Sequence, residues 1–153
     1  MSGRVPTLSA LGARLADRLA DARPPGVAAA YVFGAHAEGR VHRESDLDVG
    51  VVFDRTAYPT RAARFDAGVR LGAWIAAELG EPRVDLVVLD DAPPGLAARV
   101  ATSGTRVYCA DAEADHALRR DAQLRAADLA PFLARARRLK LEALRRPVPM
   151  SGT

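Results

Sequence analysis

The residues that could do chemistry begin with two aspartates, Asp46 and Asp48, at the start of the apolar segment 47–53. Successive side chains of a strand alternate between its faces, so side chains two residues apart point to the same side. Two carboxylates held close together raise one another's pKa unless a cation neutralises them. Oxygen ligands with no cysteine or paired histidine nearby favour Mg²⁺, which completes its shell with water and substrate phosphates. The pair therefore predicts a site for Mg²⁺ and a phosphate-bearing substrate.

A third aspartate, Asp85, lies in the otherwise apolar segment 84–89. A carboxylate is costly to place in such a segment without a partner. If this segment forms a strand beside 47–53, Asp85 would join Asp46 and Asp48. Three carboxylates could then hold two metal ions for an in-line displacement at phosphorus.

A glycine, Gly34, ends the apolar segment 27–33. Glycine lets backbone amides approach an anion closely, and the start of a helix is a place suited to phosphate. The turn therefore predicts a cradle for a triphosphate. Arg40, His42 and Arg43 stand between this turn and the aspartate pair, where they would add positive charge around bound phosphates.

The spacing of these residues resembles that of a known family. Gly34-Ala35, ten further residues and then Asp46-Leu47-Asp48 match the Gly-Ser, ten residues, Asp-x-Asp signature of the minimal nucleotidyltransferases (MNT) in the DNA polymerase beta superfamily. The resemblance continues through the segments 83–89, 92–94 and 104–108 and covers roughly residues 8 to 145. Within the superfamily, the chain resembles the MntA-type antitoxins of HEPN/MNT toxin–antitoxin systems. The fuller pattern is also met at Ala37, Gly39 and Ser45.

The resemblance implies a function and a set of site residues. Asp46 and Asp48 would hold the metal ions, and Asp85 would complete the metal site and help to activate the acceptor hydroxyl. The implied reaction is Mg²⁺-dependent transfer of AMP from ATP to a tyrosine of a HEPN-domain toxin, with which the chain would form a hetero-oligomer. The nucleotide would be bound by Gly34, Ala35, Arg40 and Ser45.

One residue departs from the family pattern: Ala35 stands where the family has a serine that contacts the triphosphate. Losing one such contact costs on the order of 1 kcal/mol and leaves backbone amides and arginines to hold the phosphates. The alternative function is therefore a non-catalytic antitoxin that neutralises its partner by binding. Transfer of a nucleotide to a small molecule such as an aminoglycoside ranks last, because the chain lacks a substantial second domain for acceptor recognition.

Apolar periodicity predicts the elements that position these residues. An amphipathic helix is expected over 8–19, with Thr7 as its N-cap. Short apolar, branched segments predict strands over 27–33, 47–53 and 84–89. Together they predict an α/β fold of the polymerase-beta-like nucleotidyltransferase type, with a small mixed sheet flanked by helices.

The longest helix between these strands is expected over 61–79, with one stripe facing the core. That stripe is predicted to hold Phe65, Val69, Gly72 and Ile75. Tyr31 and Trp74 are likewise expected in the core, and His36 and His116 on the surface or in hydrogen bonds.

The C-terminal part is expected to form a short helix over 96–102, a fourth strand over 106–108 and two helices within 112–144. Pro131 is expected to divide those two helices, since proline starts a helix more readily than it continues one. Their basic residues predict a solvated face, with a partner-binding or RNA-facing surface as the alternative: Arg119, Arg120, Arg125, Arg135, Arg137, Arg138 and Lys140.

Length and composition narrow the class of protein. A chain of 153 residues fits one domain, expected over 1–146, and residues 147–153 are expected to be a disordered tail. The single cysteine, Cys109, excludes an internal disulfide and a cysteine zinc cluster and fits a cytoplasmic protein. No segment approaches the about 20 apolar residues of a membrane span. The net charge of +3 is too small to indicate nucleic acid as the direct substrate.

Overall fold

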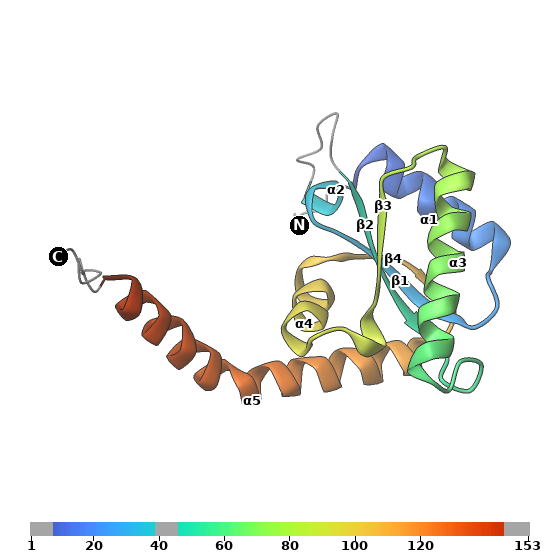
Figure 1. Cartoon of the computed structure of the whole chain (residues 1–153). Helices are drawn as coiled ribbons and strands as arrows, with labels where there is room; N and C mark the ends of the chain where they lie inside the picture. Colours follow the sequence, from blue (N-terminus) through green and yellow to red (C-terminus); the bar gives the residue numbers. More distant parts are fainter. Residues whose placement is uncertain (1–7, 39–45, 146–153) are drawn as a thin grey trace, which may run out of the picture.

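The structure, a computed structural model, describes residues 8–38 and 46–145 (Figure 1). Its centre is a four-stranded sheet in the order β3-β2-β1-β4. The bounds of the strands are β1 (Val27–Phe33), β2 (Leu47–Phe53), β3 (Val84–Val88) and β4 (Thr105–Cys109). β1 pairs antiparallel with β2 and with β4, whereas β2 and β3 run parallel. This mixed sheet confirms the predicted α/β class, and it confirms that the strand carrying Asp85 lies beside β2.

Helices cover both faces of this sheet (Figure 1). α1 and α3 pack on one face against β-strand residues such as Val49 and Val51. α4 and the first turns of α5 pack on the other face, where Tyr31 and Val52 are buried. The helices are α1 (Ala10–Ala22), α2 (Ala35–Glu38), α3 (Arg61–Leu79), α4 (Pro94–Ser103) and α5 (Ala112–Arg145), with a 3₁₀ turn η1 (Leu89–Asp91) after β3.

The start of α1 differs from the prediction. The N-cap is Ser9 and not Thr7, because the Ser9 hydroxyl accepts a hydrogen bond from the Gly12 amide at 3.0 Å. A capping oxygen lies two or three residues before the amide that it satisfies, so the Ser9–Gly12 bond places the helix start at Ala10.

The predicted bounds of α3 are confirmed, but its predicted buried stripe holds only for Ile75 and for Gly72, which faces Leu86 of β3. Phe65 and Val69 are 67% and 58% exposed, while Ile75 is buried as expected. The glycines of α3 face β3 instead: a Cβ on Gly68 would stand only 2.9 Å from Val88 Cγ2. Because the glycine side of α3 packs closely on β3, the larger side chains of its first half, Phe65 and Val69, lie outside the core.

The two helices expected in the C-terminal part are one. α5 runs unbroken from Ala112 to Arg145 with Pro131 inside it, so the predicted division is wrong. A proline inside a helix removes one amide donor and bends the helix, but the neighbouring alanine, leucine and arginine residues favour helix strongly enough to continue it. Figure 1 shows that α5 changes direction along its length. No helix within residues 8–38 and 46–145 is long and apolar enough to cross a membrane.

Candidate active site

Three neighbouring strands bring the predicted site residues to one end of the sheet. Asp48 lies opposite Phe33, the last residue of β1, and opposite Asp85 of β3. Gly34 follows Phe33 directly, so the glycine turn and both carboxylates meet at this end. This arrangement requires β1 to run antiparallel and β3 to run parallel to β2, which is what the sheet contains.

The strand pleat decides which face these carboxylates occupy. Asp48 alternates with Val49, which is buried against α1 and α3, so the Asp48 side chain points to the other face. Asp85 alternates in the same way with Leu86, which packs toward α3. Asp48 is half-buried, whereas Asp46 and Asp85 are exposed. The Asp48 and Asp85 carboxylates therefore share a face of the sheet that is open to solvent at this end, and Asp46 lies directly before β2.

These carboxylates repel one another. Burial raises the pKa of Asp48 above its ordinary value, and the charges of Asp85 and then Asp46 raise it further. The charge of His36 acts in the opposite direction on the same pKa. No ion pair within the described part of the chain engages any of the three aspartates. A bound cation would relieve this repulsion.

Gly34 is pressed against Asp48. Its φ of 71° lies in the left-handed region that favours glycine, and a Cβ there would stand 2.6 Å from Asp48 Oδ2. The turn thus needs glycine for its backbone conformation and for the carboxylate beside it. Ala35 then opens the four-residue helix α2 with a methyl group where a hydroxyl would be a hydrogen-bond donor.

His36, expected from the sequence on the surface or in hydrogen bonds, is buried and hydrogen-bonded next to the Gly34 turn, although sequence reasoning gave it no role in the site. It is 3% exposed, and its Nδ1 lies 2.8 Å from the Ser9 hydroxyl oxygen. The Ser9 amide also donates to the His36 carbonyl oxygen at 2.9 Å. Ser9 therefore caps α1 and holds α2 at once, which fixes the turn at Gly34. The only signal in the sequence was the adjacency of His36 to the glycine motif.

The donor chemistry of the site fits Mg²⁺ although the ligand set is incomplete as it stands. Across residues 8–38 and 46–145, no three histidine, cysteine or carboxylate side chains converge tightly enough to enclose a metal ion. Mg²⁺ is commonly held by one or two protein carboxylates, with water and substrate phosphates completing its shell. Asp46, Asp48 and Asp85 therefore suit a metal that arrives with a nucleotide. Arg40 and Ser45, predicted to bind that nucleotide, lie outside the described residues.

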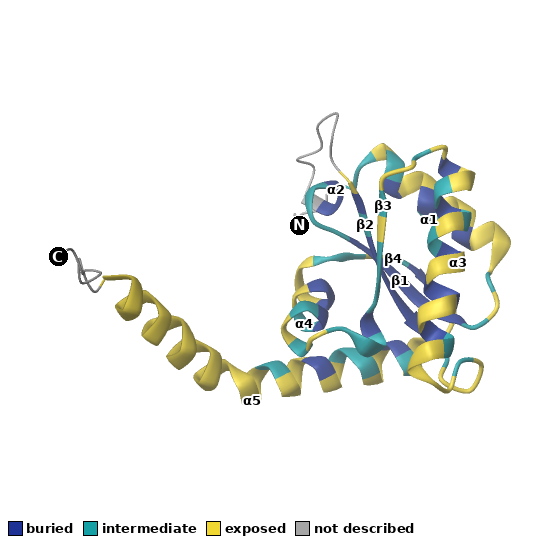
Figure 2. Ribbon diagram, viewed as in Figure 1, coloured by how far each residue is buried: buried dark blue, intermediate teal, exposed yellow. Residues whose placement is uncertain are grey.

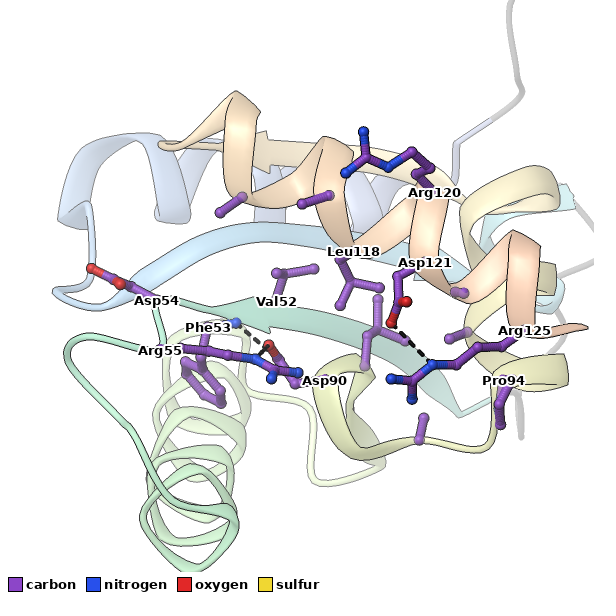
Figure 3. A pocket seen from close by; sticks show the side chains of 16 residues that line it. Val52, Phe53, Asp54, Arg55, Asp90, Pro94, Leu118, Arg120, Asp121 and Arg125 are labelled. Carbon is purple, nitrogen blue, oxygen red and sulfur yellow. Dashed lines mark hydrogen bonds and ion pairs between the residues drawn. The ribbon is translucent and has the colours of Figure 1, made fainter.

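A separate cavity of about 500 Å³ lies beside Val52 and Phe53 (Figure 3), at the end of β2 opposite to Asp48. It is lined by Phe53 and Asp90 from the sheet side and by Leu118, Asp121 and Arg125 of α5. It contains none of the predicted site residues.

Comparison with known proteins supports the fold. The model of the family "Polymerase beta, Nucleotidyltransferase" matches residues 18–113. No curated protein sequence matches the chain. A toxin–antitoxin structure with AMP-PNP is similar at 24% identity and a TM-score of 0.56, over 82% of this chain and 97% of the other. The MntA–HepT toxin–antitoxin is similar at 21% identity and a TM-score of 0.52, over 82% and 97%.

A third similar structure is the Shewanella oneidensis complex of a tri-AMPylated HEPN toxin with an MNT antitoxin. It has 22% identity and a TM-score of 0.52, over 82% of this chain and 96% of the other. At these identities the structures show a shared fold. The family match includes Gly34, Asp46, Asp48 and Asp85 and more than half of the chain. The chain therefore belongs to the polymerase beta nucleotidyltransferase family.

Proposed function

We propose that this chain is an antitoxin that transfers AMP from ATP to a tyrosine of a HEPN-domain toxin in a Mg²⁺-dependent reaction. The observation that carries the proposal is the glycine turn pressed against Asp48, with Asp46 and Asp85 beside it. The similar structures include one with AMP-PNP and one with a tri-AMPylated HEPN toxin, which supports both the donor and the acceptor. Because ATP is the donor, the proposed place of action is the cytoplasm.

The residues at this end of the sheet divide the work of binding. The backbone amides that follow Gly34 would hold the triphosphate, since glycine leaves room for an anion to approach them. Asp46, Asp48 and Asp85 would hold Mg²⁺, which when bound neutralises the phosphate charge and polarises the reacting phosphorus. Asp48, the most buried of the three, lies where a side chain at position 34 would displace its carboxylate, so Gly34 leaves it room.

Asp85 would act as the base. It lies on β3, an edge strand of the sheet, and is exposed, so a protein acceptor can reach it. As the tyrosine oxygen forms a bond to the α-phosphorus of ATP, Asp85 takes the hydroxyl proton. The bond from the α-phosphorus to the bridging oxygen breaks, and pyrophosphate leaves with the electron pair. The products are AMP-tyrosine and pyrophosphate.

The test is transfer of labelled AMP from ATP to a purified HEPN-domain partner in the presence of Mg²⁺. Asp48→Asn should lose the transfer, whereas Asp66→Asn should keep it, because Asp66 is an exposed aspartate on α3, outside the site. Transfer that survives Asp48→Asn unchanged would remove the assignment.

A second function is favoured by one residue, Ala35, which lacks the hydroxyl of the family motif. On this alternative the chain neutralises the toxin by contact alone. The two functions separate by mass spectrometry of the toxin from a co-expressed complex. An unmodified toxin that is still neutralised when the antitoxin carries Asp46→Ala indicates the binding function.

A further inference from the structure

The outer half of α5 extends beyond the domain. Every residue from 127 to 145 is exposed, and Figures 1 and 2 show this part of the helix projecting away from the sheet and the other helices. The family match ends at residue 113, so this half lies outside the region shared with the family model. An isolated helix of this length gains most of its stability in proteins from packing of an apolar face.

That outer half carries such a face. Large apolar and alanine side chains recur at steps of three and four, as on one side of an amphipathic helix. We call this the apolar stripe, and it consists of Leu129, Phe132, Leu133, Ala136 and Leu139.

The apolar stripe continues the side of α5 that packs on the domain. Asp115 and Ala122 are buried, and Leu118 packs among the buried residues of the α4 side. Leu129 follows Ala122 by seven residues and Phe132 follows Leu118 by fourteen, which are whole numbers of turns to a good approximation. The same side of α5 is thus apolar along both halves of the helix. The domain covers this side in the first half, whereas nothing in the described structure covers it in the outer half.

The cavity at the far end of β2 adjoins this stripe. Leu118 and Arg125, which are seven residues apart on α5, line the cavity. Two further steps of seven residues reach Phe132 and Leu139 of the stripe. Figure 3 shows the Arg55–Asp90 and Asp121–Arg125 ion pairs around the cavity. A partner lying along the stripe could therefore place a side chain in a cavity of about 500 Å³.

The charge of this half indicates what kind of partner fits. Residues 127–145 hold five basic side chains and two acidic ones. Arg137 follows Leu133 by four residues and lies at the edge of the stripe, and Lys140 follows Ala136 by four and ends the stripe. Pairing with a second copy of the chain would bring these cations together, which is unfavourable. An acidic surface with an apolar centre is complementary.

The position of the domain disfavours a membrane as the partner. The sheet and α4 lie on the side of α5 that carries Leu118, and the stripe faces the same side. A flat bilayer touching the whole stripe would meet the domain, whereas a protein can enter the angle between the domain and the helix (Figure 1).

We infer that the apolar stripe and the adjoining cavity are the docking surface for the toxin partner, which presents an apolar helix face flanked by Asp and Glu. The inference rests on the proposed function for the identity of the partner. It assigns recognition of the partner to α5 and nucleotide chemistry to the opposite end of β2.

The test measures binding of the full-length chain to the purified HEPN-domain partner. Phe132→Asp and Leu133→Asp should each weaken binding at least about 30-fold, because an anchor side chain is lost and an acid faces an acidic surface. Leu124→Asp and Leu141→Asp are the matched controls, being 60% and 50% exposed on the same helix but turned away from the stripe. They should change binding by less than about threefold.

The outcomes separate this inference from the proposed function. Stripe variants that bind and are modified like the wild type overturn the docking surface and leave the proposed function standing. A stripe-dependent complex without AMP transfer supports the docking surface and overturns the enzymatic proposal. Absence of any complex overturns both. Stripe-dependent binding to phosphatidylglycerol vesicles, or stripe-dependent dimerisation by analytical ultracentrifugation, would assign the surface to a membrane or to a second copy and overturn the inference.

Discussion

The aspartates at the two ends of β2 and β3 stand in opposite surroundings. Beyond the far ends of these strands, Asp91 accepts two hydrogen bonds from Arg64 at 2.8 and 2.9 Å, and Asp90 accepts one from the Phe53 amide at 3.0 Å. At the near ends, Asp48 and Asp85 have no such partner among the described residues and face each other across the sheet.

The pKa values of Asp91 and Asp48 shift in opposite directions, whereas burial raises the pKa of Asp90 despite its hydrogen bond to the Phe53 amide. Hydrogen bonding to Arg64 lowers the pKa of Asp91, while burial and then the charges of Asp85 and Asp46 raise the pKa of Asp48. One end therefore stabilises the fold through charges that are already neutralised. The other end holds repelling charges that a ligand can neutralise, which is what a site for a metal-bound nucleotide requires.

The largest expected effect is on catalysis, and it concerns Asp48, at the end of the sheet where the aspartates have no partner among the described residues. Asp48→Asn should lower AMP transfer by on the order of 1,000-fold or more, because loss of a metal ligand removes several kcal/mol of transition-state stabilisation. The same variant should melt at an equal or higher temperature, since it removes a half-buried charge among like charges. Steady-state transfer assays and thermal unfolding measure the two effects. A variant that unfolds at a lower temperature would show that Asp48 is structural.

At the other end, where Asp91 pairs with Arg64, we expect a loss of stability without a loss of activity. Asp91→Asn should lower the free energy of unfolding by about 3 kcal/mol, because it leaves the Arg64 charge buried without its partner. The Arg64 and Asp91 side chains are only 8% and 18% exposed, so solvent cannot replace the lost pair. Transfer activity per folded molecule should not change.

The difference in free energy of unfolding between the wild type and Asp91→Asn depends on pH, because the pKa of Asp91 is lowered in the folded protein. The ion pair contributes its full stability above the unfolded-state pKa and loses it as pH falls through the lower folded-state pKa. The gap between wild type and Asp91→Asn should therefore be constant above about pH 5 and shrink below about pH 4. Urea unfolding across this range measures it, and a gap that widens in acid would contradict the ion-pair account.

Gly34 offers a test of the contact at the unpaired end. Gly34→Ala should destabilise the fold by about 2 kcal/mol, from the left-handed backbone and the clash with Asp48. Gly80→Ala is the matched control, with a φ of 62° but nothing within 4 Å of its Cβ, and should cost only about 1 kcal/mol. Adding Asp48→Ala to Gly34→Ala should recover the excess. Equal costs for the two glycines would mean that the carboxylate does not constrain the turn.

The smallest expected effect is a gain in affinity for ATP. Ala35→Ser restores the hydroxyl of the family motif, and one hydrogen bond to a phosphate of about 1 kcal/mol corresponds to roughly fivefold tighter ATP binding. Calorimetric titration of ATP into both proteins checks this. Unchanged affinity would show that the backbone and the arginines already bind the triphosphate without it.

Local pattern was sufficient for much of the fold. The bounds of β1, β2 and α3 follow from apolar runs and from Gly34 and Gly80 at the ends, because these signals act within a few residues. The pairing of Asp46 with Asp48 on one face also needs only the alternation of a strand.

Tertiary structure decided the rest. Whether Asp85 joins the other aspartates depends on β3 lying parallel beside β2, which no local signal contains. The exposure of Phe65, the burial of His36 and the continuity of α5 through Pro131 depend likewise on what packs against each residue. The physical reason is that sequence periodicity describes which side chains share a face, whereas burial is a property of the surface that the face meets.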